Sequence, residues 1–223
     1  LNAGQTCVSV DYVLIHSSVK DGFIKYLQKE LKKRYPNALN NDTYPRIINE
    51  HHYKRLMNLI KSEDSIIGGR GDDVVRRLEP TILPDVDFDH EIMKEEIFGP
   101  VLPIIEYDDI NNVIRIIKEH EKPLACYVFT RDEDTAKHII KSISYGGGCI
   151  NDVIIQVSNH YMPFGGVGSS GIGSYHGKFG FDTFSHKKSI VWSETMIDLP
   201  IRYAPFSPLK FRMLKKILES FND

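Results

Sequence analysis

The chain opens on Asn2-Ala3-Gly4-Gln5-Thr6-Cys7, which runs directly into Val8-Ser9-Val10-Asp11-Tyr12-Val13-Leu14-Ile15. The second stretch is rich in β-branched residues and predicts a buried strand. Gly4 permits a tight turn before that strand, so Cys7 is expected where a turn of small residues meets a sheet. Such a position can present a thiol at the rim of the sheet, although an isolated cysteine is more often a small buried hydrophobe.

Strands and amphipathic helices alternate through the rest of the chain. Further strands are predicted at 65–69, 80–84, 101–107, 124–130 and 149–155. Apolar residues at helical spacing predict helices that follow Ser17 or Ser18, span about 48–62, follow Asp108 and surround 136–143. The first of these helices has its apolar side at Val19, Phe23, Leu27 and Leu31. The alternation predicts an α/β fold, with a mostly parallel twisted sheet flanked by helices.

The last quarter of the chain departs from this alternation. Residues 165–180 are too rich in glycine for a helix and predict a surface loop that lets backbone approach a ligand. Phe181–Trp192 then predicts a late strand, suited to pairing with a second subunit, and 208–223 predicts a helical tail with one apolar side. We therefore expect an α/β domain at 1–180, an oligomerisation strand and arm at 181–207, and the tail at 208–223. The apolar side of the tail comprises Phe211, Leu214, Ile217, Leu218 and Phe221.

The composition is that of a globular protein. Of the 223 residues, 41% are hydrophobic and 26% charged, and the formal net charge of -2 gives no electrostatic reason to expect nucleic acid. The three cysteines, Cys7, Cys126 and Cys149, form no Cys-x-x-Cys pair, so neither a disulfide framework nor a zinc site is predicted. Cys126 and Cys149 fall within predicted strands and are expected to be core thiols. No stretch approaches the roughly 18 consecutive apolar residues of a membrane helix.

Three patterns that could signal a ligand are rejected. Gly68-Gly69-Arg70-Gly71 is not followed by the Lys-Ser/Thr of a phosphate-binding loop. The acidic run 85–91 lacks the glycine and terminal glutamate of a calcium loop. His51 and His52 are adjacent and cannot share one helix face. No metal site is predicted.

Two further motifs change the interpretation of Cys7. They are Glu95-Glu96-Ile97-Phe98-Gly99-Pro100 and Pro163-Phe164-Gly165-Gly166-Val167-Gly168-Ser169-Ser170-Gly171. In order and spacing, these motifs and Gly4–Cys7 resemble the aldehyde dehydrogenase superfamily, and the resemblance covers nearly the whole chain. The glycine-rich motif, Tyr175-His176-Gly177-Lys178 and 181–186 look most like the fatty-aldehyde and coniferyl-aldehyde branch of that superfamily.

The resemblance implies NAD- or NADP-dependent oxidation of an aldehyde to a carboxylic acid. Cys7 would attack the aldehyde carbonyl, the thiohemiacetal would transfer hydride, and water would hydrolyse the thioester. Glu96 would accept hydrogen bonds from the hydroxyls of the nicotinamide ribose, and Phe98 would form a flat apolar wall beside it. Taken alone, Glu96 would be a solvated carboxylate and Phe98 a core residue.

The resemblance also places the aldehyde entrance at the glycine-rich motif. Phe164 lies in that motif, and His160 and Tyr161 just before it are expected to touch substrate. Members of this branch are typically homodimers. A cytoplasmic protein is expected, with possible peripheral membrane contact through the basic, amphipathic tail.

Parts of the family's machinery are absent from these residues. There is no cofactor-binding glycine turn, adenosine-binding lysine or general-base glutamate before Cys7. The chain is therefore expected to be the catalytic C-terminal part of a longer polypeptide, separated from its N-terminal cofactor domain and inactive alone. Three alternatives stay open: a CoA-acylating aldehyde dehydrogenase, a cysteine hydrolase pairing Cys7 with a histidine such as His160, and a non-catalytic assembly subunit.

Overall fold

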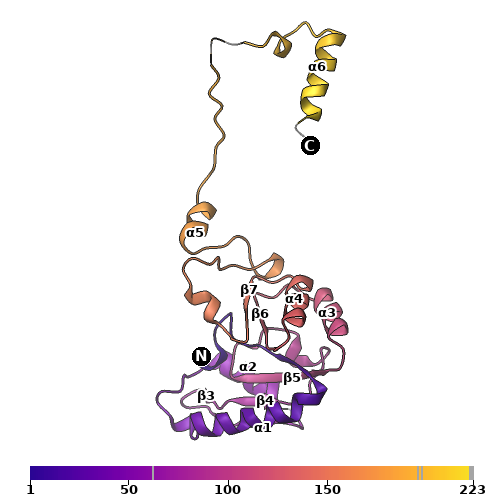
Figure 1. Cartoon of the computed structure of the whole chain (residues 1–223). Coiled ribbons are helices and arrows are strands. Elements are labelled where there is room, and N and C mark those ends of the chain that lie inside the picture. The colour runs from indigo at the N-terminus through magenta and orange to yellow at the C-terminus, as the bar shows by residue number, and fades with distance from the viewer. Residues whose placement is uncertain (62, 195, 197, 221–223) are drawn as a thin grey trace. The chain divides into compact units, whose positions relative to one another are not determined.

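The computed structural model describes residues 1–61, 63–194, 196 and 198–220. The chain divides into two compact units, Leu1–Ser185 and His186–Asp223. The first unit is an α/β unit with parallel strands and flanking helices, as predicted (Figure 1).

A three-stranded parallel sheet forms the centre of the first unit. Its order is β1 (Val13–His16), β5 (Val101–Tyr107) and β4 (Thr81–Leu83), with Val13 opposite Ile104 and Thr81 opposite Val101. The strand predicted at 8–15 begins only at Val13. Residues before it leave the sheet because Ser9 N–H closes a turn onto the Thr6 carbonyl and the Asp11 carboxylate binds another loop.

Helix α1 (Ser17–Arg34) covers one face of this sheet. Its Ile24, Leu27 and Leu31 pack on Ile15, Ile82 and Ile104. Val19 and Phe23, predicted on the apolar side, are instead exposed. Lys20 shares the packed side with Ile24 instead, and it binds Asp85 and Glu106 at 2.8 and 2.9 Å, partners that the spacing of apolar residues does not reveal.

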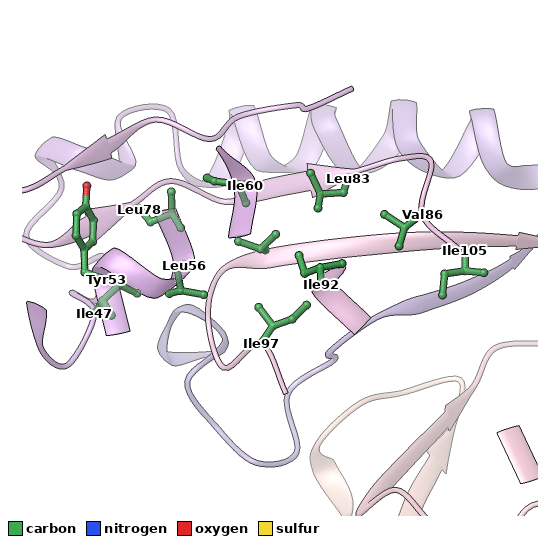
Figure 2. Packing of buried hydrophobic residues seen from close by; sticks show 11 residues of the cluster. Ile47, Tyr53, Leu56, Ile60, Leu78, Leu83, Val86, Ile92, Ile97 and Ile105 are labelled. Carbon is green, nitrogen blue, oxygen red and sulfur yellow. The ribbon is translucent and has the colours of Figure 1, made fainter. Parts of the chain in front are cut away.

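Helix α2 (Glu50–Ile60) covers the other face and is capped by the side chain of Asn49. Its Tyr53, Leu56 and Ile60 point into the main core, with Leu56 fully buried (Figure 2). The other buried members of this core come from the sheet and its loops: Ile47, Leu78, Leu83, Val86, Ile92, Ile97, Val101 and Ile105.

A second parallel pair joins β6 (Ala125–Val128) to β7 (Gly147–Ile150). Helices α3 (Ile110–Glu119) and α4 (Glu133–Ser142) pack against it, in a cluster built from Ile114, Val128, Ile139 and Ile143. The N-cap of α3 is Asp109, whereas Asp108 was predicted; Asp108 instead accepts a hydrogen bond from Ser17.

The strand predicted at 149–155 lies earlier in the chain. It begins at Gly147 because β6 and β7 approach closely there: a β-carbon on Gly148 would lie 1.8 Å from the Cys126 carbonyl oxygen. Cys126 and Cys149 both lie in strands as predicted, each half-buried rather than fully buried. The strand predicted at 65–69 is reduced to one antiparallel bridge between Ile67 and Ile82.

Shorter elements complete the first unit. Strands β2 (Gly71–Asp72) and β3 (Arg77–Leu78) form an antiparallel pair, and α5 spans Gly177–Thr183. Helix α5 contradicts two predictions: it begins within the glycine-rich stretch 165–180, which was expected to form a loop, and it contains Phe181 of the strand predicted at 181–192. Residues 185–194 have no regular secondary structure, so the predicted strand is absent; its backbone has no neighbouring strand to bond. Five 3-10 turns lie at Asn2–Gly4, Ala38–Asn40, Glu91–Met93, Ile155–Ser158 and Gly168–Ser170.

The second unit contains a 3-10 turn at Pro200–Arg202 and helix α6 (Pro208–Glu219), whose N-cap is Ser207. The predicted tail helix is therefore present. Its Phe211, Ile217 and Leu218 are exposed, and Phe221 lies outside the described residues. Within the described ranges, none of the helices is both long and apolar enough to cross a membrane.

Ile104 lies fully buried at the centre of β5 and offers a test of the fold. We expect Ile104→Ala to lower the free energy of unfolding by about 2–5 kcal/mol, because it removes buried methylenes and leaves a cavity. Val74→Ala is the control, since Val74 is 89% exposed and should change stability by less than about 0.5 kcal/mol. Urea unfolding measures both, and equal effects would contradict the placement of Ile104.

Candidate functional site

Cys7 lies in a turn between the 3-10 turn Asn2–Gly4 and β1, and its thiol is free and exposed. Gly4 adopts a left-handed backbone conformation (φ +76°), as do Asn2 and Ala3 (φ +46° and +49°). This run reverses the chain so that Cys7 stands on the surface before the strand begins. The position matches the predicted turn at the rim of a sheet.

Gln5 attaches this turn to the segment that precedes α2. Its side-chain Nε2 donates to the Arg46 carbonyl at 3.0 Å, and its Oε1 accepts from the Ile48 N–H at 2.9 Å. Both functions of the amide are used by backbone groups, which fixes the orientation of the side chain.

Tyr127 holds the other side of the turn. Its hydroxyl donates to the Val8 carbonyl at 2.6 Å and accepts from Gln156 Nε2 at 3.1 Å. The Gln156 Oε1 in turn accepts from the Cys149 thiol at 2.9 Å. Burial raises the pKa of Tyr127, so its hydroxyl stays protonated as a donor at neutral pH. This network links the residue after Cys7 to β6, β7 and the turn Ile155–Ser158.

The Glu95–Pro100 loop lies directly against the Cys7 turn. A β-carbon on Gly4 would stand 2.0 Å from the Gly99 carbonyl oxygen, so the two backbones touch. A β-carbon on Gly99 would meet the Leu56 side chain at 2.5 Å on its other side. The structure thus brings together two motifs that are far apart in the sequence, with glycine at the contact in each.

Two opposite charges hold the Glu95–Pro100 loop. Arg55 of α2 donates to the Glu95 carboxylate at 3.0 Å and to the backbone carbonyls of Glu96 and Ile97. From the Cys7 side, the Asp11 carboxylate accepts the Ile97 N–H at 3.0 Å. Phe98, the next residue, adopts φ +52°, a left-handed conformation that few bulky residues take.

The predicted cofactor residues present different surfaces. Glu96 is exposed, yet its carboxylate lies partly among protein atoms. This desolvation and the nearby negative charge of Asp11 raise the pKa of Glu96, and the positive charge of Arg55 offsets part of the rise. Desolvation by burial likewise raises the pKa of Asp11. Phe98 is half-buried and lines a shallow pocket of about 270 Å³ together with Asn2, Gln5, Arg46 and Ile48.

These groups fit part of a nicotinamide nucleotide. Phe98 and Ile48 supply apolar surface beside the amide groups of Asn2 and Gln5, and the exposed Glu96 carboxylate can accept hydrogen bonds from hydroxyls. A larger pocket of about 470 Å³ lies over α2 and contains none of the predicted site residues. Its lining is His51, Lys54, Arg55, Asn58, Leu59, Glu63 and Glu91.

The third motif forms an aromatic cluster. Phe164 pairs with Tyr175 through two backbone hydrogen bonds of 2.9 Å, and their rings lie 5.4 Å apart. The His160 ring lies 5.7 Å from that of His176, which stacks on Phe164. Tyr161 is 91% exposed. In the part of the chain that the structure describes, no hydrogen bond or ring contact joins His160, Tyr161 or Phe164 to Cys7.

Sequence reasoning missed the side chains that support the site. Asp11 had a visible signal, because a carboxylate interrupts an apolar run where a buried strand was expected. Gln5 lies within a quoted motif but was given no role. Arg55, Tyr127 and Gln156 carry no local signal, since their partners are distant in the sequence.

Comparison with known proteins identifies the family. The profile of the aldehyde dehydrogenase family matches residues 1–190. The chain is 43% identical over 222 residues to the 4,4'-diaponeurosporen-aldehyde dehydrogenase of Staphylococcus aureus, covering 98% of this chain and 48% of that protein. It is 45% identical over 208 residues to the dimeric NADP-preferring aldehyde dehydrogenase of Canis lupus familiaris, covering 92% of this chain and 46% of the relative. The chain thus spans about half the length of these relatives.

Solved structures agree with this assignment. The substrate-bound state of Staphylococcus aureus AldH superposes with a TM-score of 0.87 at 43% identity, covering 97% of this chain and 48% of that one. The NADP complex of glyceraldehyde-3-phosphate dehydrogenase from Methanocaldococcus jannaschii gives a TM-score of 0.75 at 30% identity, covering 86% and 43%. With two of the three motifs in contact and the family profile matching residues 1–190, the chain belongs to the aldehyde dehydrogenase family.

Proposed function

We propose that this chain carries the nucleophile and part of the nicotinamide site of an NAD- or NADP-dependent aldehyde dehydrogenase. The observation that supports this most directly is the backbone contact between Gly4 and Gly99, which sets the Cys7 turn beside the loop carrying Glu96 and Phe98. A nucleophile and a cofactor must be neighbours if hydride is to pass from a carbon bound to the first onto the second.

Cys7 carries the covalent chemistry. Its thiolate attacks the aldehyde carbonyl, forming a C–S bond and an oxyanion that the Cys7 backbone N–H stabilises. A nicotinamide held by Glu96 and Phe98 would supply the hydride acceptor, which would allow this oxyanion to collapse to a thioester on Cys7. Water then breaks the C–S bond, releasing the carboxylic acid and the thiol. The exposure of Cys7 is consistent with attack on a substrate that arrives from solvent.

Glu96 is proposed to bind the cofactor as a carboxylate, which leads to a prediction. Glu96→Gln keeps the shape but weakens the acceptor, so we expect KM for the nicotinamide cofactor to rise about tenfold with little change in KM for aldehyde. Because the pKa of Glu96 is raised, wild-type cofactor affinity should fall as pH is lowered toward that pKa, and this dependence should be lost in Glu96→Gln. Steady-state kinetics against pH in both proteins measure the effect; an unchanged cofactor KM would contradict the assignment.

The substrate is proposed to enter along the glycine-rich motif. His160, Tyr161 and Phe164 supply aromatic and apolar surface there, which favours a medium- or long-chain or aromatic aldehyde. The resemblance to the fatty-aldehyde and coniferyl-aldehyde branch supports the same class. Within the described residues, no hydrogen bond or ring contact joins His160 to Cys7, so the structure gives no support to a cysteine hydrolase.

Residues 1–223 alone are proposed to be incompetent. Glu96 and Phe98 can hold a ribose and a ring edge, but the adenosine and pyrophosphate would need further residues, and this chain covers only 48% of the length of the Staphylococcus aureus relative. We define the extended protein as this chain joined to the remaining part of a full-length aldehyde dehydrogenase of this family. NADH or NADPH formation over a panel of aldehydes, with and without CoA, tests the function in the extended protein. The isolated chain, confirmed as folded, should give no multiple turnover.

Assembly and location are proposed from the second unit. Ile190, Val191 and Trp192 are 74%, 87% and 89% exposed, which is consistent with an arm that completes a homodimer. Helix α6 combines exposed apolar residues with basic residues, which suits either packing over the substrate entrance or peripheral contact with an anionic membrane. We place the protein in the cytoplasm.

A further inference from the structure

The Glu95–Pro100 loop has a feature that the roles of Glu96 and Phe98 do not explain. Its backbone is held by side chains rather than by a strand partner: Arg55 binds two of its carbonyls, and Asp11 binds the Ile97 N–H. Phe98 follows with φ +52°. A left-handed conformation at a bulky residue persists only where its surroundings fix it.

Asp11 is well placed to fix it. The residue lies four positions after Cys7, and its Oδ1 reaches Ile97 across 86 positions of the sequence at 3.0 Å. The Phe98 N–H also interacts with this carboxylate. A carboxylate that faces two successive N–H groups determines the direction in which the following side chain leaves the backbone.

Removing the Asp11 carboxylate from water costs desolvation free energy, which a purely structural residue need not incur. Its carboxylate is largely removed from water, although Arg55 is close enough to offset part of the charge. An apolar residue would continue the run of Val8–Ile15 without that cost. A half-buried charge directed at the backbone of one loop is consistent with a role in orientation.

We propose that Asp11 is a positioning residue, which holds Glu96 and Phe98 in their cofactor-binding orientation and ties their loop to the segment carrying Cys7. The proposal rests on the cofactor role proposed for Glu96 and Phe98. In this role Asp11 acts through the Ile97 and Phe98 backbone.

The test compares Asp11→Ala with Asp11→Asn in the extended protein. Alanine removes the acceptor, so KM for NAD+ or NADP+ should rise about tenfold while KM for aldehyde stays within about twofold. Asparagine keeps an acceptor oxygen in the same place and should restore cofactor KM to within about threefold of wild type. Asp21→Ala, at an exposed carboxylate of α1, is the matched control and should change neither constant.

Several results would overturn the proposal. These are an unchanged cofactor KM in Asp11→Ala, an asparagine variant as impaired as alanine, and equal losses for cofactor and aldehyde. If Asp11→Ala does not fold, Asp11→Glu replaces it. The added methylene displaces the carboxylate, so KM for the cofactor should rise while KM for aldehyde does not. A wild-type cofactor KM in Asp11→Glu would contradict the proposal.

A second measurement separates this proposal from the function on which it rests. Hydrogen exchange of the Ile97 amide should be faster by about tenfold in Asp11→Ala and near wild type in Asp11→Asn, with β5 amides unchanged. Failure of the wild-type extended protein to oxidise aldehydes would refute the proposed function. An Ile97 amide unaffected by Asp11→Ala would refute the positioning role whatever the activity.

Discussion

Cys7→Ser is expected to reduce aldehyde oxidation by the extended protein on the order of a thousandfold or more, with the fold intact. The Cys7 thiolate is the proposed nucleophile, and an alcohol is far harder to deprotonate than a thiol. Cys7 lies exposed in a turn, so the change from sulfur to oxygen removes no core packing.

The effect at Cys7 is measured by NADH or NADPH formation together with iodoacetamide labelling located by peptide mass. Cys126→Ala is the matched control: Cys126 packs against the α3–α4 cluster, and its replacement should leave activity unchanged. Labelling at Cys7 requires only access and is expected in residues 1–223 alone. Wild-type turnover by Cys7→Ser would refute the nucleophile assignment.

The fold was predictable wherever local pattern and long-range packing agree. Val101–Tyr107 matches the bounds of β5 because a run of apolar residues between a Gly-Pro turn and an aspartate leaves little other choice. Helix α1 was also predicted, but its rotation was not, because Lys20 turns inward to Asp85 and Glu106. Those partners lie far along the chain, and helical spacing alone cannot reveal them.

Errors at strand ends have similar causes. Gly147 and Gly148 look like a helix breaker, yet they form β7 because the Cys126 backbone comes so close. Phe181–Trp192 has β-prone residues, but propensity without a neighbouring strand does not make a strand, and Phe181 joins α5 instead.

The motifs of the candidate site could be predicted from the sequence, but the side chains that hold those motifs in place could not. The resemblance predicts roles for Cys7, Glu96 and Phe98, and the structure shows that the segments carrying them touch. Gln5, Asp11 and Tyr127 hold those segments through bonds to backbone atoms 41, 86 and 119 positions away. Bonds to backbone place few demands on the sequence of the partner, so no pattern reveals them.

Gly4→Ala is expected to be highly damaging although it substitutes none of the proposed functional side chains. The new β-carbon would lie 2.0 Å from the Gly99 carbonyl oxygen, a backbone atom that no rotamer change can move, and φ +76° is itself strained for alanine. Either the Cys7 turn or the Glu96 loop must shift. Because misplacement by about 1 Å can cost a hundredfold in rate, kcat/KM of the extended protein should fall at least about a hundredfold.

Gly22→Ala is the matched control for this prediction. Gly22 lies within α1, where a β-carbon meets nothing within 4 Å, so alanine should be neutral or stabilise the helix by about 0.5–1 kcal/mol. Kinetics and thermal unfolding of both variants separate loss of activity from loss of fold. If Gly4→Ala retains wild-type kcat/KM, the two backbones do not touch in the working enzyme, and the contact that supports the proposed function would have to be abandoned.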